Sequence, residues 1–373
     1  MLVPLDDSPW HQIPTTFDHV GTSDVRFFDR FWFAASAPDG SGTLQFTIGV
    51  YQNMNVIDGG FVVVRNGRQH NVRASRQLRP LYDTCTGPLR FDVIAPFEHV
   101  RLTIEPNEGG VHGVLDWRGT SDAQEETHHF ARRWGRVLED YSRYDQIGEL
   151  SGWLEIDGER VELSDWWACR DHSWGVRERV GIPEPFTGAV EAPGASMFSF
   201  LFFSTSTHAG HVQLTAREGA EHFTAEVVDL ATGAHTEGSD VSIDATFVDE
   251  GRPRRFDRAT LRVTEADGSV STYEVERNGS AVAMLGLGYG GYDDGLGLGV
   301  YRGLQHLEHD VWDVSHPAEV GLPDGRTDRP VHRIQPVRVV RHSADGTSEG
   351  FGSLTFIAEL PLDEDGHLRV GHG

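Results

Sequence analysis

The sequence predicts an all-β fold built from two antiparallel barrels or strongly coiled sandwiches, with few short helices. Asx-Gly pairs recur between β-rich runs, at Asp39, Asp58, Asn66, Asp157, Asp267, Asn278, Asp324 and Asp345. Such pairs supply the positive φ angles that tight hairpins need. The flanking runs alternate apolar and polar residues, which is the period of a strand. These observations indicate antiparallel sheet rather than βαβ units.

The expected elements follow in chain order. The first half begins with strands at 43–51 and 60–65. Residues 124–144 carry the single expected helix, because Phe130, Trp134, Val137, Leu138 and Tyr141 fall at helical spacings. A β-hairpin over 152–163 closes at Asp157-Gly158.

The second half continues the strand pattern. The run 197–203 is apolar throughout, which is typical of a strand that is buried on both faces. Residues 259–264 form another alternating strand.

Length predicts two domains. A chain of 373 residues exceeds one comfortable hydrophobic core, so we expect two units of about 180 residues each. Proline and glycine interrupt the strand pattern between Gly175 and Gly194, and we place the domains at 1–178 and 179–373. A small barrel of about eight strands has an interior just wide enough for one apolar ligand.

Charge limits the partners. The formal net charge is -25, and all 32 basic residues are arginine. A charge of this sign repels phosphate backbones and anionic lipid, so we expect neither nucleic acid nor a membrane surface as a partner. Met1–Trp10 has no signal-peptide pattern and no later window reaches the length of a spanning segment, which predicts a cytoplasmic protein.

The sequence predicts no cofactor and no metal. The two cysteines, Cys85 and Cys169, form no Cys-x-x-Cys pair and are expected to be reduced thiols. Gly286–Gly291 matches a dinucleotide motif by letter, but the residues after it cannot open the helix that this motif requires. We expect a glycine-rich strand bend or barrel corner there.

The richest segment runs from Trp166 to Gly175 and ends in Arg-Asp-His-Ser-Trp-Gly. On a strand, His172 and Trp174 share one face and Asp171 takes the other. His172 is a candidate proton donor or acceptor, and the faces of Trp174 and Trp167 can stabilise a developing cation. The alternative is a histidine that merely packs under tryptophans at a domain junction, with Asp171 capping backbone amides.

A second polar stripe lies at 304–313. His306, Glu308 and Asp310 would share one strand face, where a carboxylate could hold the His172 imidazole. A solvated face is the alternative interpretation. One sheet face cannot present both His306 and His309 to a metal. Two further candidates, Tyr51 and Asn53, could line a ligand mouth or serve only as turn residues.

The motif 170–175, entered from Gly152–Gly158, resembles the signature of the hydroxyneurosporene synthase (carotenoid 1,2-hydratase) and AttH-like family. This resemblance implies two lipocalin-like (calycin) β-barrels, a ligand cavity at or between them, and acid/base chemistry on an apolar substrate without an organic cofactor. It also implies functional roles for His172 and Trp174. The hydratase branch has a Tyr-x-Asp downstream of the motif, which Phe198–Phe200 lacks, so Glu308 or Asp310 would replace that carboxylate.

We therefore expect a cofactor-independent lyase, of the hydratase type, or an isomerase that acts on a hydrophobic alkene, terpenoid, steroid or aromatic substrate. The expected catalytic residues are His172, Trp174, Asp171 and Glu308; those expected to bind substrate are Trp167, Tyr51, Asn53, His306 and Asp310. A pericyclase or cyclase would use the same cavity to hold a folded substrate. A lipocalin-like carrier with no turnover is the third possibility, and the sequence leaves the oligomeric state open.

Overall fold

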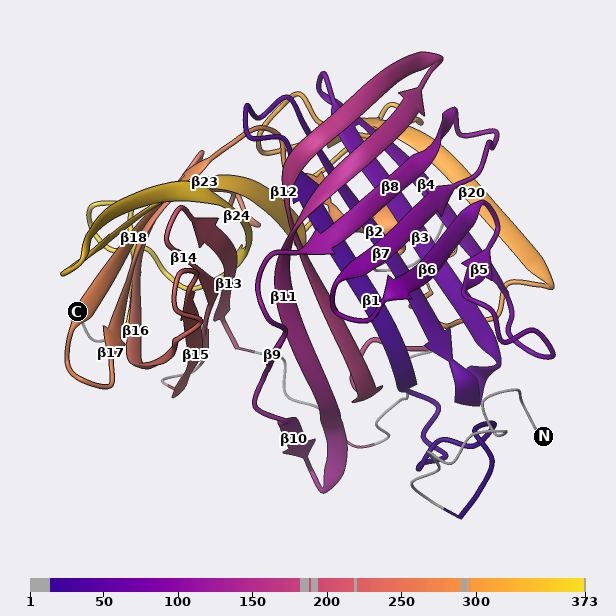
Figure 1. The fold of residues 1–373 in the computed structure, drawn as a ribbon, viewed down its shortest axis with the longest axis horizontal. Coiled ribbons are helices and arrows are strands. Elements are labelled where there is room, and N and C mark those ends of the chain that lie inside the picture. The colour runs from indigo at the N-terminus through magenta and orange to yellow at the C-terminus, as the bar shows by residue number, and fades with distance from the viewer. Residues whose placement is uncertain are drawn as a thin grey trace.

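The structure is a computed structural model, which describes residues 14–181, 188, 194–217, 220–289, 294 and 296–371. Within these ranges the chain is mostly antiparallel sheet, as predicted, and its helical segments include the short 3-10 turns η2 (Gln52–Met54) and η3 (Met284–Leu287). The two sheets lie side by side, with the N-terminal one mostly in indigo to magenta and the C-terminal one in dark red, orange and yellow (Figure 1).

The N-terminal sheet runs in the order β4-β3-β2-β1-β12-β11-β8-β7-β6-β5. Its strands are β1 (Phe27–Ser36), β2 (Gly42–Tyr51), β3 (Val56–Arg65), β4 (Arg68–Gln77), β5 (Cys85–Thr86), β6 (Leu89–Ala95), β7 (His99–Ile104), β8 (Val111–Gly119), β9 (Gln124–Glu125), β10 (His129–Arg133), β11 (Arg136–Ile156) and β12 (Glu159–Val176). The short strands β9 and β10 pair with β11 at its first half.

This sheet coils around its own apolar core. The strands β5 and β6 contact β3 across the interior, so that a Cβ on Gly59 would meet Leu89 and Thr86. Trp117, Phe33 and Phe46 are among the fully buried side chains that fill the space between them. The long hairpin of β11 and β12 turns at Asp157 and Gly158, whose φ angles are +51° and +82°, as the Asp-Gly pair predicts.

The C-terminal sheet is a closed barrel of eight strands, because β15 pairs with β16 and so joins the two ends of the order β15-β14-β13-β24-β23-β18-β17-β16. The strands are β13 (Ser196–Thr205), β14 (His208–Arg217), β15 (Ala220–Asp229), β16 (His235–Phe247), β17 (Phe256–Glu265), β18 (Val270–Arg277), β23 (Arg333–Ser343) and β24 (Gly346–Ala358), with β19 (Val282–Ala283) and β25 (Leu368–Val370) attached. A second apolar cluster fills this barrel.

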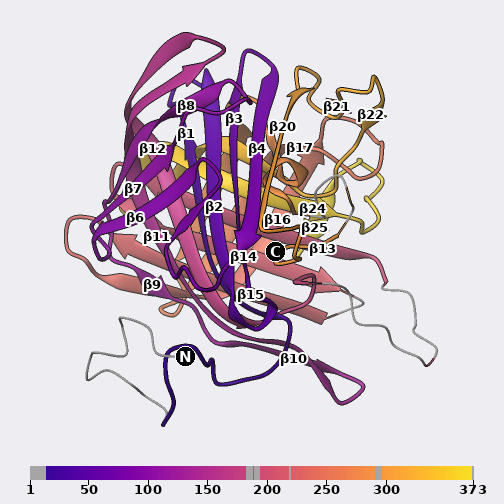
Figure 2. The same cartoon turned by 90° about the vertical axis from the view of Figure 1, so that its right-hand side faces the viewer.

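One segment from the second half of the chain joins the first sheet. The strand β20 (Gln305–Asp313) pairs along the whole length of β4, and β21 (Val320–Gly321) and β22 (Thr327–Asp328) extend that edge. Figure 2 shows β20 beside β4. The division at residue 178 stays a prediction. At least one strand from the second half of the sequence, β20, belongs to the N-terminal sheet.

The helix expected over 124–144 is wrong. These residues form β9, β10 and the start of β11, and the tip of the β10–β11 hairpin lies at Trp134 and Gly135, both with positive φ. Phe130 and Trp134 are 57% and 54% exposed, so they would give a helix no apolar face to bury. Pairing with β12 supplies the backbone partners of β11 from Asp140 to Ile156 instead.

Several expectations fall on other parts of the chain. The N-terminal segment Met1–Trp10 and most of the boundary region between Gly175 and Gly194 lie outside the described residues, as do Gly290 and Gly291 of the glycine-rich motif. The start of that motif is the 3-10 turn η3 rather than a strand bend. Both cysteines are free thiols, as expected. Among the described residues, no helix has the length and apolar character needed to cross a bilayer.

Candidate functional site

Strand β12 sits at the centre of the candidate site because it pairs with β1 on one side and β11 on the other. In this register His172 lies opposite Phe31 of β1 and Tyr144 of β11, so the three side chains form one row across the sheet. The row faces the core of the N-terminal sheet. Asp171 is turned to the opposite face, which is the alternation that a strand predicts.

The imidazole of His172 is held by one carboxylate and three aromatic rings. Its Nε2 lies 2.7 Å from Oδ1 of Asp29, which is hydrogen-bond distance. The ring stacks on Phe31 with centroids 3.7 Å apart and planes 6° from parallel. Tyr144 meets it edge-on at 5.3 Å, and Trp174 leans over it at 4.9 Å. We call these five residues the His172 site.

A buried cation lies next to the His172 site. Arg170, two residues earlier on the same face, is 1% exposed and donates to Oε1 of Gln146 at 2.6 Å. Its guanidinium lies over the rings of Trp117, at 4.4 Å, and Tyr144, at 5.4 Å. Burial lowers the pKa of Arg170 and raises that of Tyr144. Neutral Tyr144 can therefore donate a hydrogen bond at physiological pH.

The other face of β11 and β12 carries a second group of polar residues. Asp145 and Asp171 are register partners there. Arg143, two residues before Asp145, lies on the same face of β11. Glu126, which follows β9, and His211 from β14 complete the group, which lies where the N-terminal sheet packs against the C-terminal barrel. We call Glu126, Arg143, Asp145, Asp171 and His211 the junction cluster.

The junction cluster is tightly buried. Glu126, Asp145 and His211 have side chains that are 1%, 2% and 3% exposed. Arg143 donates to both carboxylate oxygens of Glu126, at 2.8 and 2.7 Å. The two oxygens of Asp145 and Nδ1 of His211 have no hydrogen-bond partner among the described residues, and Asp145 Oδ2 lies 3.6 Å from that nitrogen.

Burial and crowding separate the pKa values of the two carboxyl groups. Burial, together with the charge of Glu126, raises the pKa of Asp145 well above its usual range. The guanidinium of Arg143 overcomes the burial of Glu126 and holds its pKa low. Burial also raises the pKa of Asp171 and lowers that of His211. One atom from each of Glu126, Asp145 and His211 lies within 4.8 Å of the others, so these three could hold a metal ion within the part of the chain that the structure describes.

The expectation that Glu308 or Asp310 holds His172 is wrong. Both carboxylates lie on β20, which four strands separate from β12, and they accept hydrogen bonds from Arg73 of β4 at 3.4 and 2.9 Å. His306 bonds Glu308 at 2.8 Å. His306, Glu308 and Asp310 do share one strand face, as predicted. Because β20 pairs with β4, however, they lie near the edge of the sheet. Asp29 is the carboxylate that lies beside the imidazole of His172.

The remaining expected ligand-binding residues have structural partners. The indole of Trp167 is buried between the two sheets and donates to Oγ of Ser204 at 3.1 Å. Tyr51 is fully buried in a network with Arg30 and Asp58. The amide of Asn53 donates to the carbonyls of two N-terminal residues, Thr22 and Asp24. These contacts give each side chain a packing role, and a role in binding stays a prediction.

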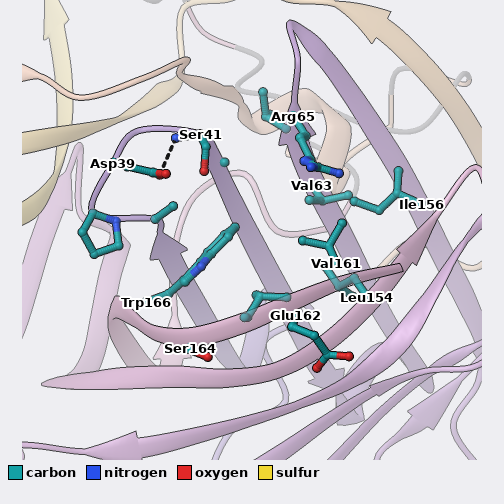
Figure 3. A pocket seen from close by; sticks show the side chains of 15 residues that line it. Asp39, Ser41, Val63, Arg65, Leu154, Ile156, Val161, Glu162, Ser164 and Trp166 are labelled. Carbon is teal, nitrogen blue, oxygen red and sulfur yellow. Dashed lines mark hydrogen bonds between the residues drawn. The ribbon is translucent and has the colours of Figure 1, made fainter. Parts of the chain in front are cut away.

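A separate cleft opens at the far end of β12. Trp166 and His172 are six positions apart on β12, which is about 20 Å along an extended strand. The cleft has a volume of about 370 Å³ and lies between the β1–β2 turn and the β11–β12 hairpin. Figure 3 shows the ring of Trp166 across from aliphatic side chains, including Val63, Leu154 and Val161. Its size suits a small ligand.

A family model for a family of unknown function (DUF8625) matches residues 2–352. The chain belongs to this family. No curated protein matches the sequence. Among solved structures, the chain is similar to CghA with Sch210972, at 12% identity, with 89% of this chain and 88% of that chain covered and a TM-score of 0.50.

Two further structures resemble the chain more weakly. A structure titled CghA has 11% identity, 89% and 88% coverage and a TM-score of 0.48; kievitone hydratase from Nectria haematococca has 8% identity, 88% coverage of each chain and a TM-score of 0.46. The likeness to CghA with Sch210972, at 12% identity, shows a fold and no activity. The closed C-terminal barrel agrees with the predicted all-β architecture, while membership of the carotenoid 1,2-hydratases stays a prediction.

Sequence reasoning missed several residues of these sites, among them Asp29, Glu126 and His211. Asp29 is separated from His172 by 143 positions, and only the register between β1 and β12 brings them together. The sequence offered one signal, because Asp29 and Phe31 are two residues apart and therefore share a strand face. Glu126 and His211 lie in different sheets, and no spacing in the sequence connects them.

Proposed function

We propose that the protein is an acid/base enzyme that acts on a hydrophobic small molecule, as a hydro-lyase of the hydratase type or an isomerase. The observation that carries this proposal is the His172 site, where Asp29 holds an imidazole among the rings of Phe31, Tyr144 and Trp174. Proton transfer needs a group that can donate and accept a proton, and an apolar substrate needs apolar walls. This arrangement supplies both without an organic cofactor.

The proposed chemistry follows from the ring positions. Asp29 takes Nε2, so Nδ1 is the ring nitrogen that can face a substrate. In a hydration, the imidazolium gives a proton to one alkene carbon and a new C–H bond forms. The cation left on the other carbon is stabilised by the faces of Trp174 and Tyr144. Water then bonds to that carbon and returns its extra proton to the imidazole, and Asp29 stabilises the charged ring at both stages.

The test is turnover of a panel of alkenes and aryl alkenes by the wild type and by His172→Gln. We expect the variant to lose on the order of 10²–10⁴ in turnover while ligand binding, followed by tryptophan fluorescence, is retained. Trp174→Phe should cost less, since a ring face remains. The matched control is His112→Gln, because His112 also lies beside a tryptophan (Trp153, 5.7 Å) and a carboxylate (Glu155, 3.9 Å).

Equal turnover by the wild type and His172→Gln would refute the role of the imidazole. A cyclase or pericyclase is then the better interpretation if turnover persists, because such an enzyme acts chiefly by holding a folded substrate.

A carrier is the second candidate, and the cleft at Trp166 favours it. That cleft has aliphatic side chains among polar ones in its walls and lies far from the imidazole. A carrier should bind apolar ligands without converting any of the panel, and Trp166→Ala should abolish binding while His172→Gln leaves it unchanged. Loss of binding in His172→Gln alone would exclude this alternative.

A further inference from the structure

The junction cluster places three carboxyl groups, those of Glu126, Asp145 and Asp171, around the guanidinium of Arg143. Glu126, Asp145 and Asp171 converge on Arg143, whose two hydrogen-bonding nitrogens are both engaged by Glu126. Asp145 keeps two buried oxygens without a partner, and its nearest guanidinium contact is a 3.8 Å approach of Arg143 Nε. A buried carboxylate normally requires a proton, a partner or a metal ion.

The orphaned atoms belong to different sheets and point at each other. Asp145 lies on β11 of the N-terminal sheet, and His211 lies on β14 of the C-terminal barrel. Both side chains are at least nine-tenths buried, and the atoms that face each other, Oδ2 and Nδ1, are 3.6 Å apart. Two ligands bound to one ion at 2.0–2.2 Å with a tetrahedral angle lie about 3.3–3.6 Å apart. The observed separation matches that span.

A third ligand is already fixed in place. One carboxylate oxygen of Glu126 lies within 4.8 Å of the ligand atoms of Asp145 and His211. Hydrogen bonds from Arg143 and from His129, at 2.6 Å, orient this carboxylate. A carboxylate has about four lone-pair sites, and three are used here, so one is left. Outer partners of this kind hold metal ligands in position in known sites.

We propose that Glu126, Asp145 and His211 bind one divalent first-row transition-metal ion, such as Zn²⁺, which joins the N-terminal sheet to the C-terminal barrel. The donor set of one imidazole and two carboxylates suits such an ion. The cluster has three carboxyl groups around the guanidinium of Arg143, so a divalent ion would balance the charges of their ionised forms. The ion would lie on the opposite face of β12 from His172, so it is separate from the proposed proton transfer. The proposal revises the expectation that no set of residues encloses a metal.

Metal content and metal binding of the full chain test the proposal. Protein is stripped with EDTA and titrated with Zn²⁺ and Co²⁺; we expect one ion per chain with a defined affinity, and a Co²⁺ absorption spectrum typical of a tetrahedral N/O site. Binding should also raise the unfolding temperature, because the ion binds only the folded junction. His211→Asn and Asp145→Asn should each weaken binding by at least 10–100-fold, the loss seen even when an outer partner is removed.

The matched control is His208→Asn, on the same strand. His208 also lies beside a carboxylate, Asp229 at 3.8 Å, but it is outside the cluster, so its variant should bind the ion like the wild type. Circular dichroism checks that each variant folds. The proposal is overturned if the stripped wild type binds no ion in a one-to-one ratio, or if His211→Asn binds it equally well. A protonated Asp145, seen as an infrared carbonyl band that Zn²⁺ leaves unchanged, would also overturn it.

Discussion

The imidazole of His172 is stacked on the ring of Phe31 while its Nε2 lies 2.7 Å from the carboxylate of Asp29, so one strand, β1, supplies both the apolar support and the acidic partner. Phe31 and Asp29 are two residues apart and therefore share a face. Histidine–carboxylate pairs also occur elsewhere in the protein, as at His99 and Asp116, so it is the three aromatic rings around the His172–Asp29 pair that favour a role in proton transfer on an apolar substrate.

The first prediction concerns Asp29. Asp29→Asn keeps the size of the side chain but removes the charge that stabilises a protonated ring. We expect turnover to fall by about 10- to 100-fold with little change in ligand affinity, whereas Asp29→Glu should restore part of the loss. The measurement is kcat and KM on any substrate that the alkene panel identifies.

Asp122→Asn is the control for that prediction, because Asp122 is an exposed carboxylate away from the site. A loss of affinity without a loss of kcat in Asp29→Asn would assign Asp29 to substrate binding instead of proton transfer.

The second prediction concerns the last residue of the motif. Gly175 has a φ of +136°, and a Cβ at this position would lie 2.3 Å from the carbonyl oxygen of Asp140 on β11. Gly175→Ala must therefore shift β11 away from β12, at a cost of about 1–3 kcal/mol. The midpoint of urea unfolding measures this. Gly21→Ala serves as control, because nothing lies within 4 Å of its Cβ position; equal midpoints for the two variants would contradict the steric argument.

The sequence predicted local features well and distant pairings poorly. Alternation placed Asp171 and His172 on opposite faces, and the Asp157-Gly158 pair closed its hairpin as predicted. Spacing failed at Phe130 and Trp134, where a helical period arose by chance in a strand pair with exposed aromatic residues. The spacing of apolar residues alone cannot distinguish a helix from a strand here, because hydrogen bonding to a neighbouring strand decides which of them forms.

The candidate site shows the same limit. Glu308 was expected beside His172 because Asp171 points to the other face of the strand and the stripe at 306–310 offered a carboxylate, but such a stripe does not tell which strands pair. The pairing of β20 with β4 joins segments more than 200 residues apart, and this register carries Glu308 to Arg73. Asp29 and His211 were missed for the same reason. Long-range strand order is a property of the whole sheet.

The third prediction tests the buried ion pair between Arg30 of β1 and Asp58 of β3. Nη1 of Arg30 lies 2.8 Å from Oδ1 of Asp58, and both side chains are at most 2% exposed. Removing one partner leaves an uncompensated buried charge, so Asp58→Asn or Arg30→Met should each cost about 3–5 kcal/mol. The double variant should cost less than the sum of the two single changes.

Unfolding by urea measures these three variants. An exposed pair, Arg338 and Glu349, with side chains 57% exposed, provides the comparison: Glu349→Gln should change stability by less than about 1 kcal/mol. Additive effects in the Arg30 and Asp58 variants would show that the two charges do not depend on each other.

The last prediction concerns stability in mild acid. His332 precedes β23 and meets the ring of Tyr289 edge-on at 5.7 Å. Burial, together with the positive charges of Arg179 and Arg177, lowers the pKa of His332 to about 4. Between the ordinary histidine pKa of about 6.5 and this value, the unfolded chain binds a proton that the folded chain does not. Stability should therefore fall as the pH falls from about 6.5 to 4, by on the order of 1–3 kcal/mol from this residue.

In His332→Asn that part of the dependence should vanish, so the difference in unfolding free energy between variant and wild type should change with pH only in this window. His342→Asn is the matched control, since His342 lies on β23 with its side chain 42% exposed and should leave the profile unchanged. A parallel pair of profiles for the wild type and His332→Asn would mean that His332 takes up its proton in the folded protein as readily as in the unfolded chain.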